Sequence, residues 1–110
     1  MTDVLSQNDL TVTSQRMALS VLRAHKDDSL PTHDAVLAED ISERCIELVM
    51  EVITTKLDEL GSEADPDDVF DAHYDALVDR AVFWCRVFDA WARQQATAGL
   101  IEELRGALND

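Results

Sequence analysis

Metal binding is the first chemistry that the acidic and histidine residues of this 110-residue sequence suggest. Asp71, His73 and Asp75 lie close together, and Glu recurs every four residues from Glu39 to Glu51. In a helix Asp71 and Asp75 share a face that His73 does not, so the three side chains do not converge on one ion. A di-iron bundle would need inward-facing Glu-x-x-His pairs, and the sequence has none. We therefore predict no metal ligands and no cofactor.

Hydrolytic chemistry would need a positioned nucleophile or paired metal-binding carboxylates. Ser29 and His33 are neighbours in a polar connector, without a glycine-rich segment that would form an oxyanion hole. The helical nucleotide pyrophosphohydrolases hold magnesium through paired Glu-x-x-Glu and Glu-x-x-Asp motifs, and neither motif occurs here. The sequence thus predicts no catalytic residue and a protein that is not an enzyme. A metal-dependent hydrolase remains the second alternative function.

A run of acidic residues without positive neighbours is the most pronounced charge pattern. The chain has 9 Lys and Arg against 23 Asp and Glu, a formal net charge of −14. No Lys or Arg lies between Lys56 and Arg80. Like charges four residues apart on a helix repel by a few tenths of a kcal/mol. The run is therefore either an ordinary solvated helix face or a binding surface for a basic protein. The predicted partner-binding residues are Glu63, Asp68, Asp71, Asp75 and Asp79.

The charge also indicates the class of partner. It disfavours direct binding to nucleic-acid phosphates and to anionic membranes, and it favours binding to a basic protein surface. We expect a small interaction or regulatory protein. The alternative is an inhibitor, of the antirestriction or anti-CRISPR type, that mimics a nucleic-acid backbone and occupies the site of a DNA- or RNA-binding protein.

Cysteine usage and the N-terminal sequence predict a cytoplasmic protein. Cys45 and Cys85 lie in apolar surroundings, where we expect reduced core thiols, with a buried disulfide between them as the alternative. The N-terminus lacks the basic and apolar regions of a signal peptide. No apolar run approaches the ~18 residues of a membrane span.

The acidic run belongs to the stretch Asp65–Gln95, which organises the predicted fold. We expect Asp65 to cap a helix and Pro66 to occupy its first turn. Apolar residues then recur at alternating steps of four and three, which is typical of a helix packed against other helices. These predicted core residues are Phe70, Tyr74, Leu77, Ala81, Trp84, Phe88 and Trp91.

A second apolar line runs along the same predicted helix, about 100° from the first. It is too long for one short helix to cover, so the sequence predicts a homodimer joined by the same patch on both chains. The predicted interface residues are Val69, Ala76, Phe83, Val87 and Ala90.

The remaining sequence predicts an all-α fold, because glycine, proline and alternating strand patterns are scarce. We expect one domain over residues 1–110, with residues 1–9 disordered. A first helix should lie between Asp9 and Asp27, capped by Thr11 or Thr13. Its cations are expected to balance the acidic run; they are Arg16, Arg23 and Lys26.

Two more helices complete the predicted bundle. One should begin at Thr32 or His33, run to about Leu60 and end at Gly61. The long third helix is expected to break near 97–99, and a short last helix should fold back over the bundle. The predicted architecture is thus a compact helical bundle of three long helices and a short C-terminal one. The apolar residues of the last helix are Leu100, Ile101, Leu104 and Leu108.

Overall fold

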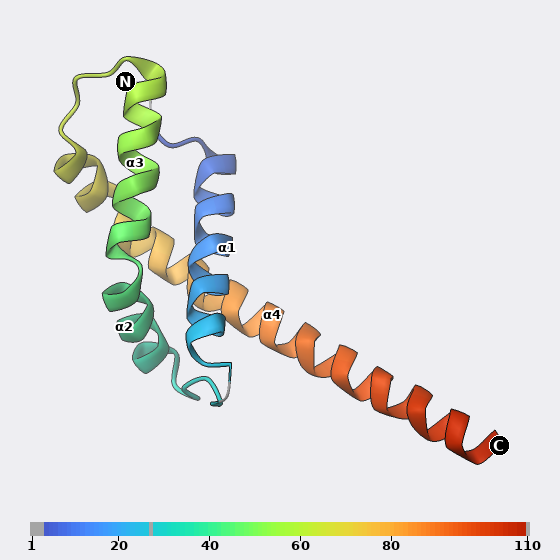
Figure 1. Cartoon of the computed structure of the whole chain (residues 1–110). Helices are drawn as coiled ribbons and strands as arrows, with labels where there is room; N and C mark the ends of the chain where they lie inside the picture. Colours follow the sequence, from blue (N-terminus) through green and yellow to red (C-terminus); the bar gives the residue numbers. More distant parts are fainter. Residues whose placement is uncertain (1–3, 27, 110) are drawn as a thin grey trace.

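The computed structural model describes residues 4–26 and 28–109, with side chains up to residue 95. Four helices follow one another: α1 (Gln7–Ala24), α2 (Asp34–Arg44), α3 (Ile46–Leu60) and α4 (Pro66–Asn109). No strand occurs in the described residues, which confirms the all-α prediction. In Figure 1, α1 lies beside α2 and α3, while α4 crosses behind them and extends far beyond.

The predicted compact shape is wrong for the chain as a whole. The Cα radius of gyration is 18.1 Å, whereas a compact domain of this length has about 13 Å. The cause is α4, whose 44 residues span about 66 Å at 1.5 Å per residue. That length equals the longest dimension of the molecule, 66 Å. The expected break near 97–99 is absent, so no separate C-terminal helix folds back over the others.

Helix α1 begins earlier than the sequence predicted. Ser6, and not Thr11 or Thr13, is its N-cap. The Ser6 hydroxyl accepts from the Asp9 backbone N–H at 3.1 Å, and the Asp9 carboxylate accepts from the Ser6 backbone N–H at 2.9 Å. This capping box satisfies two N–H groups that the helix itself leaves unpaired. Residues 7–9, expected to be disordered, are therefore helical, and residues 1–3 lie outside the described part.

The single helix predicted up to Leu60 is two helices, α2 and α3, interrupted at Cys45. The Cys45 side chain is fully buried, and its thiol lies 3.8 Å from the Met17 carbonyl oxygen of α1. On either side of the break, α2 and α3 both contact α1 and α4. Neither glycine nor proline marks the break in the sequence. The predicted end at Gly61 is confirmed, with a left-handed φ of 61°.

The break leaves helix-end carbonyl groups that need partners. One of them, on Ser42, accepts a hydrogen bond from the Tyr74 hydroxyl of α4. Burial raises the pKa of Tyr74, although the bond to Ser42 acts in the opposite direction. The hydroxyl therefore stays protonated and joins α4 to the end of α2.

Replacing Tyr74 with Phe should lower the free energy of unfolding by about 1 kcal/mol, because it removes the donor to the partly buried Ser42 carbonyl. The ring and its stacking on Phe70, at 4.3 Å between centroids, would be retained. Urea unfolding followed by circular dichroism measures the change. An unchanged midpoint would show that water replaces the hydroxyl at no cost.

The core lies where α4 crosses the other helices. All three contact α4, and α1 does so most extensively. Among the predicted core residues of α4, those in the middle are confirmed, since Tyr74, Leu77 and Ala81 are buried. The prediction is wrong at the C-terminal end of the set, because Trp91 is 61% exposed. Helix α1 ends at Ala24, so α4 leaves the body before Trp91 can be covered.

Candidate functional site

The predicted partner-binding carboxylates form an exposed acidic ridge, defined here as Glu63, Asp68, Asp71, Asp75 and Asp79. Glu63 lies in the loop before α4, and the four Asp residues lie on α4. The Asp65 side chain caps this helix by accepting from the Asp67 backbone N–H at 2.9 Å, as predicted. Asp71, Asp75 and Asp79 follow at intervals of four residues, about 6 Å apart along the axis. All five carboxylates face solvent.

No cation of the described part of the chain neutralises this ridge. The five ion pairs found there join His25 and Arg44 to Asp40, Lys56 to Asp9, Arg86 to Asp34, and Arg93 to Asp89. None involves a ridge carboxylate. The expectation that α1 balances the acids is not supported: Arg16, Arg23 and Lys26 are exposed and form no ion pair with the ridge. The repulsion among the ridge carboxylates is therefore relieved only by solvent and salt.

The helix dipole accounts for only part of the ridge. Asp68 lies in the first turn of α4, where negative charge is favourable. The effect falls off within one turn, so Asp71, Asp75 and Asp79 lie beyond its reach. These three carboxylates are therefore neither stabilised by the dipole nor paired with a cation.

The residues predicted to form the dimer interface are only partly exposed to a second chain. Val69 is 9% exposed and belongs to the core of its own chain, so it is wrongly placed in an interface. Phe83 is 59% exposed and Val87 is 38% exposed, and Ala76 and Ala90 also face solvent. The exposed apolar side chains thus concentrate toward the middle of α4, beyond the crossing with the other helices.

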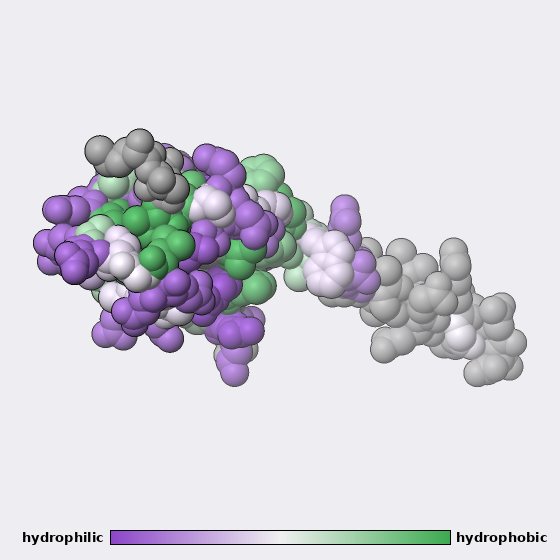
Figure 2. Space-filling model, turned by 90° about the horizontal axis from the view of Figure 1, so that it is seen from above, coloured by the Kyte–Doolittle hydropathy of each residue, from purple (hydrophilic) through white to green (hydrophobic). Residues whose placement is uncertain are grey.

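An apolar groove lies beside these residues, between the end of α1 and α4. It encloses about 560 Å³ and is formed by Leu19 and Leu22 of α1 and by Val87, Phe88, Trp91 and Ala92 of α4. Figure 2 shows hydrophilic residues over most of the face in view, with apolar surface also present near the point where α4 leaves the body. Of the predicted core residues that line this groove, Phe88 packs against the core, whereas Trp91 is exposed.

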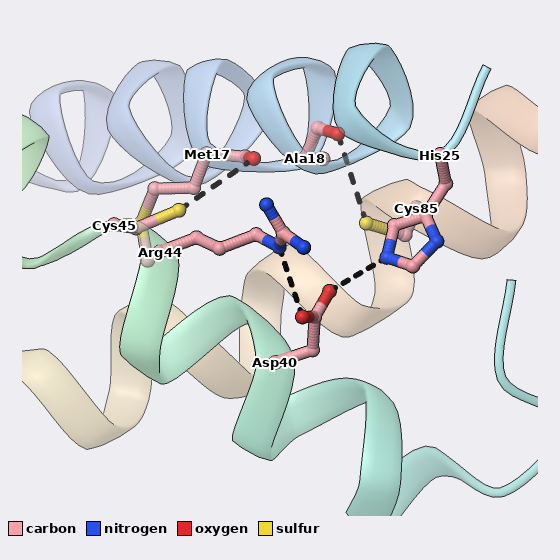
Figure 3. Close-up of polar contacts among 7 residues, drawn as sticks. All are labelled: Met17, Ala18, His25, Asp40, Arg44, Cys45 and Cys85. Carbon is pink, nitrogen blue, oxygen red and sulfur yellow. Dashed lines mark hydrogen bonds and ion pairs between the residues drawn. The ribbon is translucent and has the colours of Figure 1, made fainter.

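A polar cluster joins α1 to α2, and the sequence analysis missed it (Figure 3). His25 Nε2 lies 2.8 Å from Asp40 Oδ2, and the Arg44 Nε–H donates to Asp40 Oδ1 at 2.9 Å. Burial alone raises the pKa of Asp40, but the bonds from His25 and Arg44 outweigh it and lower that pKa below its ordinary value of 3.8. The carboxylate is thus held charged between two helices.

Cys45 and Cys85 lie near this cluster, which raises the question of a Cys–His–Asp nucleophile. Both thiols are free, buried and directed at backbone carbonyls of α1, those of Met17 and Ala18 (Figure 3). Burial raises the pKa of Cys45 to about 11 and that of Cys85 to about 12. A thiol is nucleophilic only as the thiolate, so these residues serve packing. The expectation of unbridged core thiols is confirmed.

Replacing Asp40 with Asn should lower the free energy of unfolding by about 1 kcal/mol at neutral pH. Because folding lowers the pKa of the Asp40 carboxyl, the carboxylate stabilises the folded state at any pH above its ordinary, unfolded-state pKa. This stabilisation is lost as the pH falls through the folded-state pKa. The difference between wild type and variant should therefore shrink from about pH 5 to about pH 2. Urea titrations across that range test it, with exposed Asp58→Asn as control. A difference that persists at low pH would contradict the ionic role.

Other parts of the described surface offer little for catalysis. A second cleft of about 360 Å³ between α1 and α3 mixes both charge signs, with Asp9 and Arg16 opposite Glu51 and Lys56. Across residues 4–26 and 28–95, no three His, Cys, Asp or Glu side chains converge to hold a metal ion. Neither is any helix in the described part both long and apolar enough to cross a membrane.

The chain was compared with protein-family models, with curated proteins and with solved structures, and none of the three comparisons gave a match.

Proposed function

We propose that this protein is a non-enzymatic interaction module whose acidic ridge binds a basic surface of another protein. The observation that carries the proposal is the contrast between the ridge and the other charges. Every ion pair of the described part lies elsewhere, while the five ridge carboxylates are exposed and unpaired. Complementary charge on a partner would relieve the repulsion within the ridge and speed the encounter.

The sharper form of this proposal is mimicry of a nucleic-acid backbone. Asp71, Asp75 and Asp79 form a regular line on a rigid helix, with charges about 6 Å apart. Nucleic acids also present closely and regularly spaced negative charge to their protein partners. A partner that binds DNA or RNA would then lose that binding when the ridge occupies its site. The free thiols of Cys45 and Cys85 support a cytoplasmic setting for either form.

Capture from a lysate of the native host tests the proposal with two matched variants. The ridge variant carries Asp→Asn at 68, 71, 75 and 79. The ladder variant carries Glu→Gln at four exposed positions of α2 and α3: Glu39, Glu43, Glu47 and Glu51. Each variant removes four negative charges and changes the net charge from −14 to −10. Both variants replace carboxylates with the corresponding amides, so the lost charge is the same in amount and differs in position.

Wild type and the ladder variant should capture the same basic protein at low salt and release it at high salt. The ridge variant should capture little of it. Capture that is equal for both variants would contradict the proposed site. If the captured protein binds DNA or RNA, adding that nucleic acid should release the captured protein from wild type, which would support mimicry. A complex that contains wild type, the captured protein and the nucleic acid together would contradict mimicry.

A further inference from the structure

The C-terminal part of α4 is a helix without a neighbour in the described structure. Beyond the apolar groove, α4 continues unbroken to Asn109 and projects away from the other three helices (Figure 1). The projecting part includes Gly99 and Gly106, and glycine is among the poorest helix formers. An isolated helical segment of this length is marginal in water, and its stability normally comes from packing of an apolar face.

The sequence of α4 supplies such a face across the exposed and the projecting parts. One line of residues alternates steps of four and three without interruption for almost four heptads, the pattern of a coiled-coil seam. Its members are Phe83, Val87, Ala90, Gln94, Thr97, Ile101, Leu104 and Leu108. Six of the eight are apolar, and Phe83 and Val87 are already exposed in the single chain. The seam therefore extends the apolar line that the body of the protein leaves uncovered.

The charge distribution favours a second copy of this chain as the occupant. Residues 83–109 carry three cations, Arg86, Arg93 and Arg105, and three anions, Asp89, Glu102 and Glu103. Their sum is zero, so the whole net charge of −14 lies outside this segment. Two strongly acidic chains can thus meet along the one long helical surface that adds no net repulsion.

Charge also selects the direction of pairing. A parallel pair would place the two acidic bodies side by side, whereas an antiparallel pair places them at opposite ends of the shared helical segment. Bodies separated by more than the Debye length, about 8 Å at physiological salt, are largely screened from each other. The antiparallel arrangement is therefore the one that the charge of the bodies permits.

We propose that α4 of two copies pairs antiparallel about a two-fold axis between Gln95 and Ala96. The register then places Phe83 opposite Leu108 of the second copy, Val87 opposite Leu104, and Ala90 opposite Ile101. Ala90 leaves room for Ile101 of the second copy, and the polar residues Gln94 and Thr97 share the central layer. The projecting end of each helix runs beside the apolar groove of the other copy, formed by Leu19, Leu22 and Trp91.

This interface differs from the line predicted from the sequence. It omits the buried Val69, and it moves the centre of contact from the acidic half of α4 to its neutral half. The acidic ridge of each copy stays free, so pairing and binding of a basic partner are independent. If the test of pairing fails, the proposed binding of a basic partner is unaffected, and the reverse also holds.

Sedimentation of the full chain at physiological salt tests the pairing. Wild type should be a dimer at tens of micromolar. Ile101→Glu, on the seam, should weaken association at least about tenfold, since it buries an unpaired charge. Ala96→Glu adds the same charge on the opposite face of the helix and should leave the dimer intact. A monomeric wild type, or equal effects of the two variants, would overturn the proposal.

Cysteine cross-linking tests the direction. The variant with both Val87→Cys and Leu104→Cys should form a covalent dimer on mild oxidation, because the two positions face each other across the antiparallel seam. Within one chain they lie about 25 Å apart along the helix, too far for a disulfide. Each single variant should remain uncross-linked, like wild type with its buried Cys45 and Cys85. Cross-linking of either single variant would show parallel pairing and overturn the antiparallel register.

Discussion

Truncation of Leu77 to Ala is expected to lower the free energy of unfolding by about 3 kcal/mol. Leu77 is fully buried on α4, the helix that all three others contact. The substitution removes apolar surface and leaves a cavity that the surrounding helices fill only in part. The effect should be among the largest of any single substitution, because each of the other three helices makes its most extensive contact with α4.

Chemical unfolding of the variant beside Leu60→Ala isolates this effect. Leu60 is the same residue type at 56% exposure, at the end of α3. Its truncation should change stability by less than about 0.5 kcal/mol. Similar losses in the two variants would mean that α4 does not hold the other helices together at Leu77.

Replacing Arg86 with Met is expected to cost about 2 kcal/mol, even though the residue is partly exposed. Its Nη2 donates to the carbonyl oxygens of Pro31 at 2.6 Å and Thr32 at 3.2 Å, and both Nε and Nη2 donate to Asp34 Oδ1. These bonds fasten the connector between α1 and α2 to α4. Methionine keeps the apolar stem but none of the donors.

The matched control is Arg16→Met on α1. Arg16 is exposed and makes no hydrogen bond or ion pair within the described residues, so its loss should change stability by less than about 0.5 kcal/mol. Hydrogen exchange would show where Arg86 acts: amides near Pro31 and Asp34 should exchange faster in Arg86→Met. Unchanged protection there would contradict the role of Arg86 in holding the connector.

Local signals in the sequence predicted much of α4 but not its length. The start of the helix and its apolar periodicity depend only on nearby residues, and the predictions made from them are confirmed. They are the cap at Asp65, Pro66 in the first turn, and the buried Tyr74, Leu77 and Ala81. The break expected near Gly99 is absent, because one glycine weakens a helix without ending it. The exposure of Trp91 depends on where α1 ends, which periodicity within α4 does not reveal.

Contacts between distant residues account for the rest. At the break between α2 and α3, the buried Cys45 thiol contacts the Met17 carbonyl of α1, and no glycine or proline marks the break in the sequence. The His25–Asp40 contact spans 15 positions, and those of Arg86 span more than 50. The acidic ridge was identified because it depends on spacing within one helix. The sequence did not show whether cations of the same chain pair with the ridge. In the structure, Lys56, Arg86 and Arg93 pair with carboxylates outside it.

The most direct test of the proposed function is calorimetric titration of the purified captured protein with wild type, the ridge variant and the ladder variant. Exposed charge pairs contribute about 0.2–1 kcal/mol each, so loss of four ridge charges should weaken binding at least about fourfold. The ladder variant should bind within about twofold of wild type, and raising the salt should reduce the difference between the variants. Equal affinities of the two variants at low salt would contradict an acidic ridge that binds a basic protein.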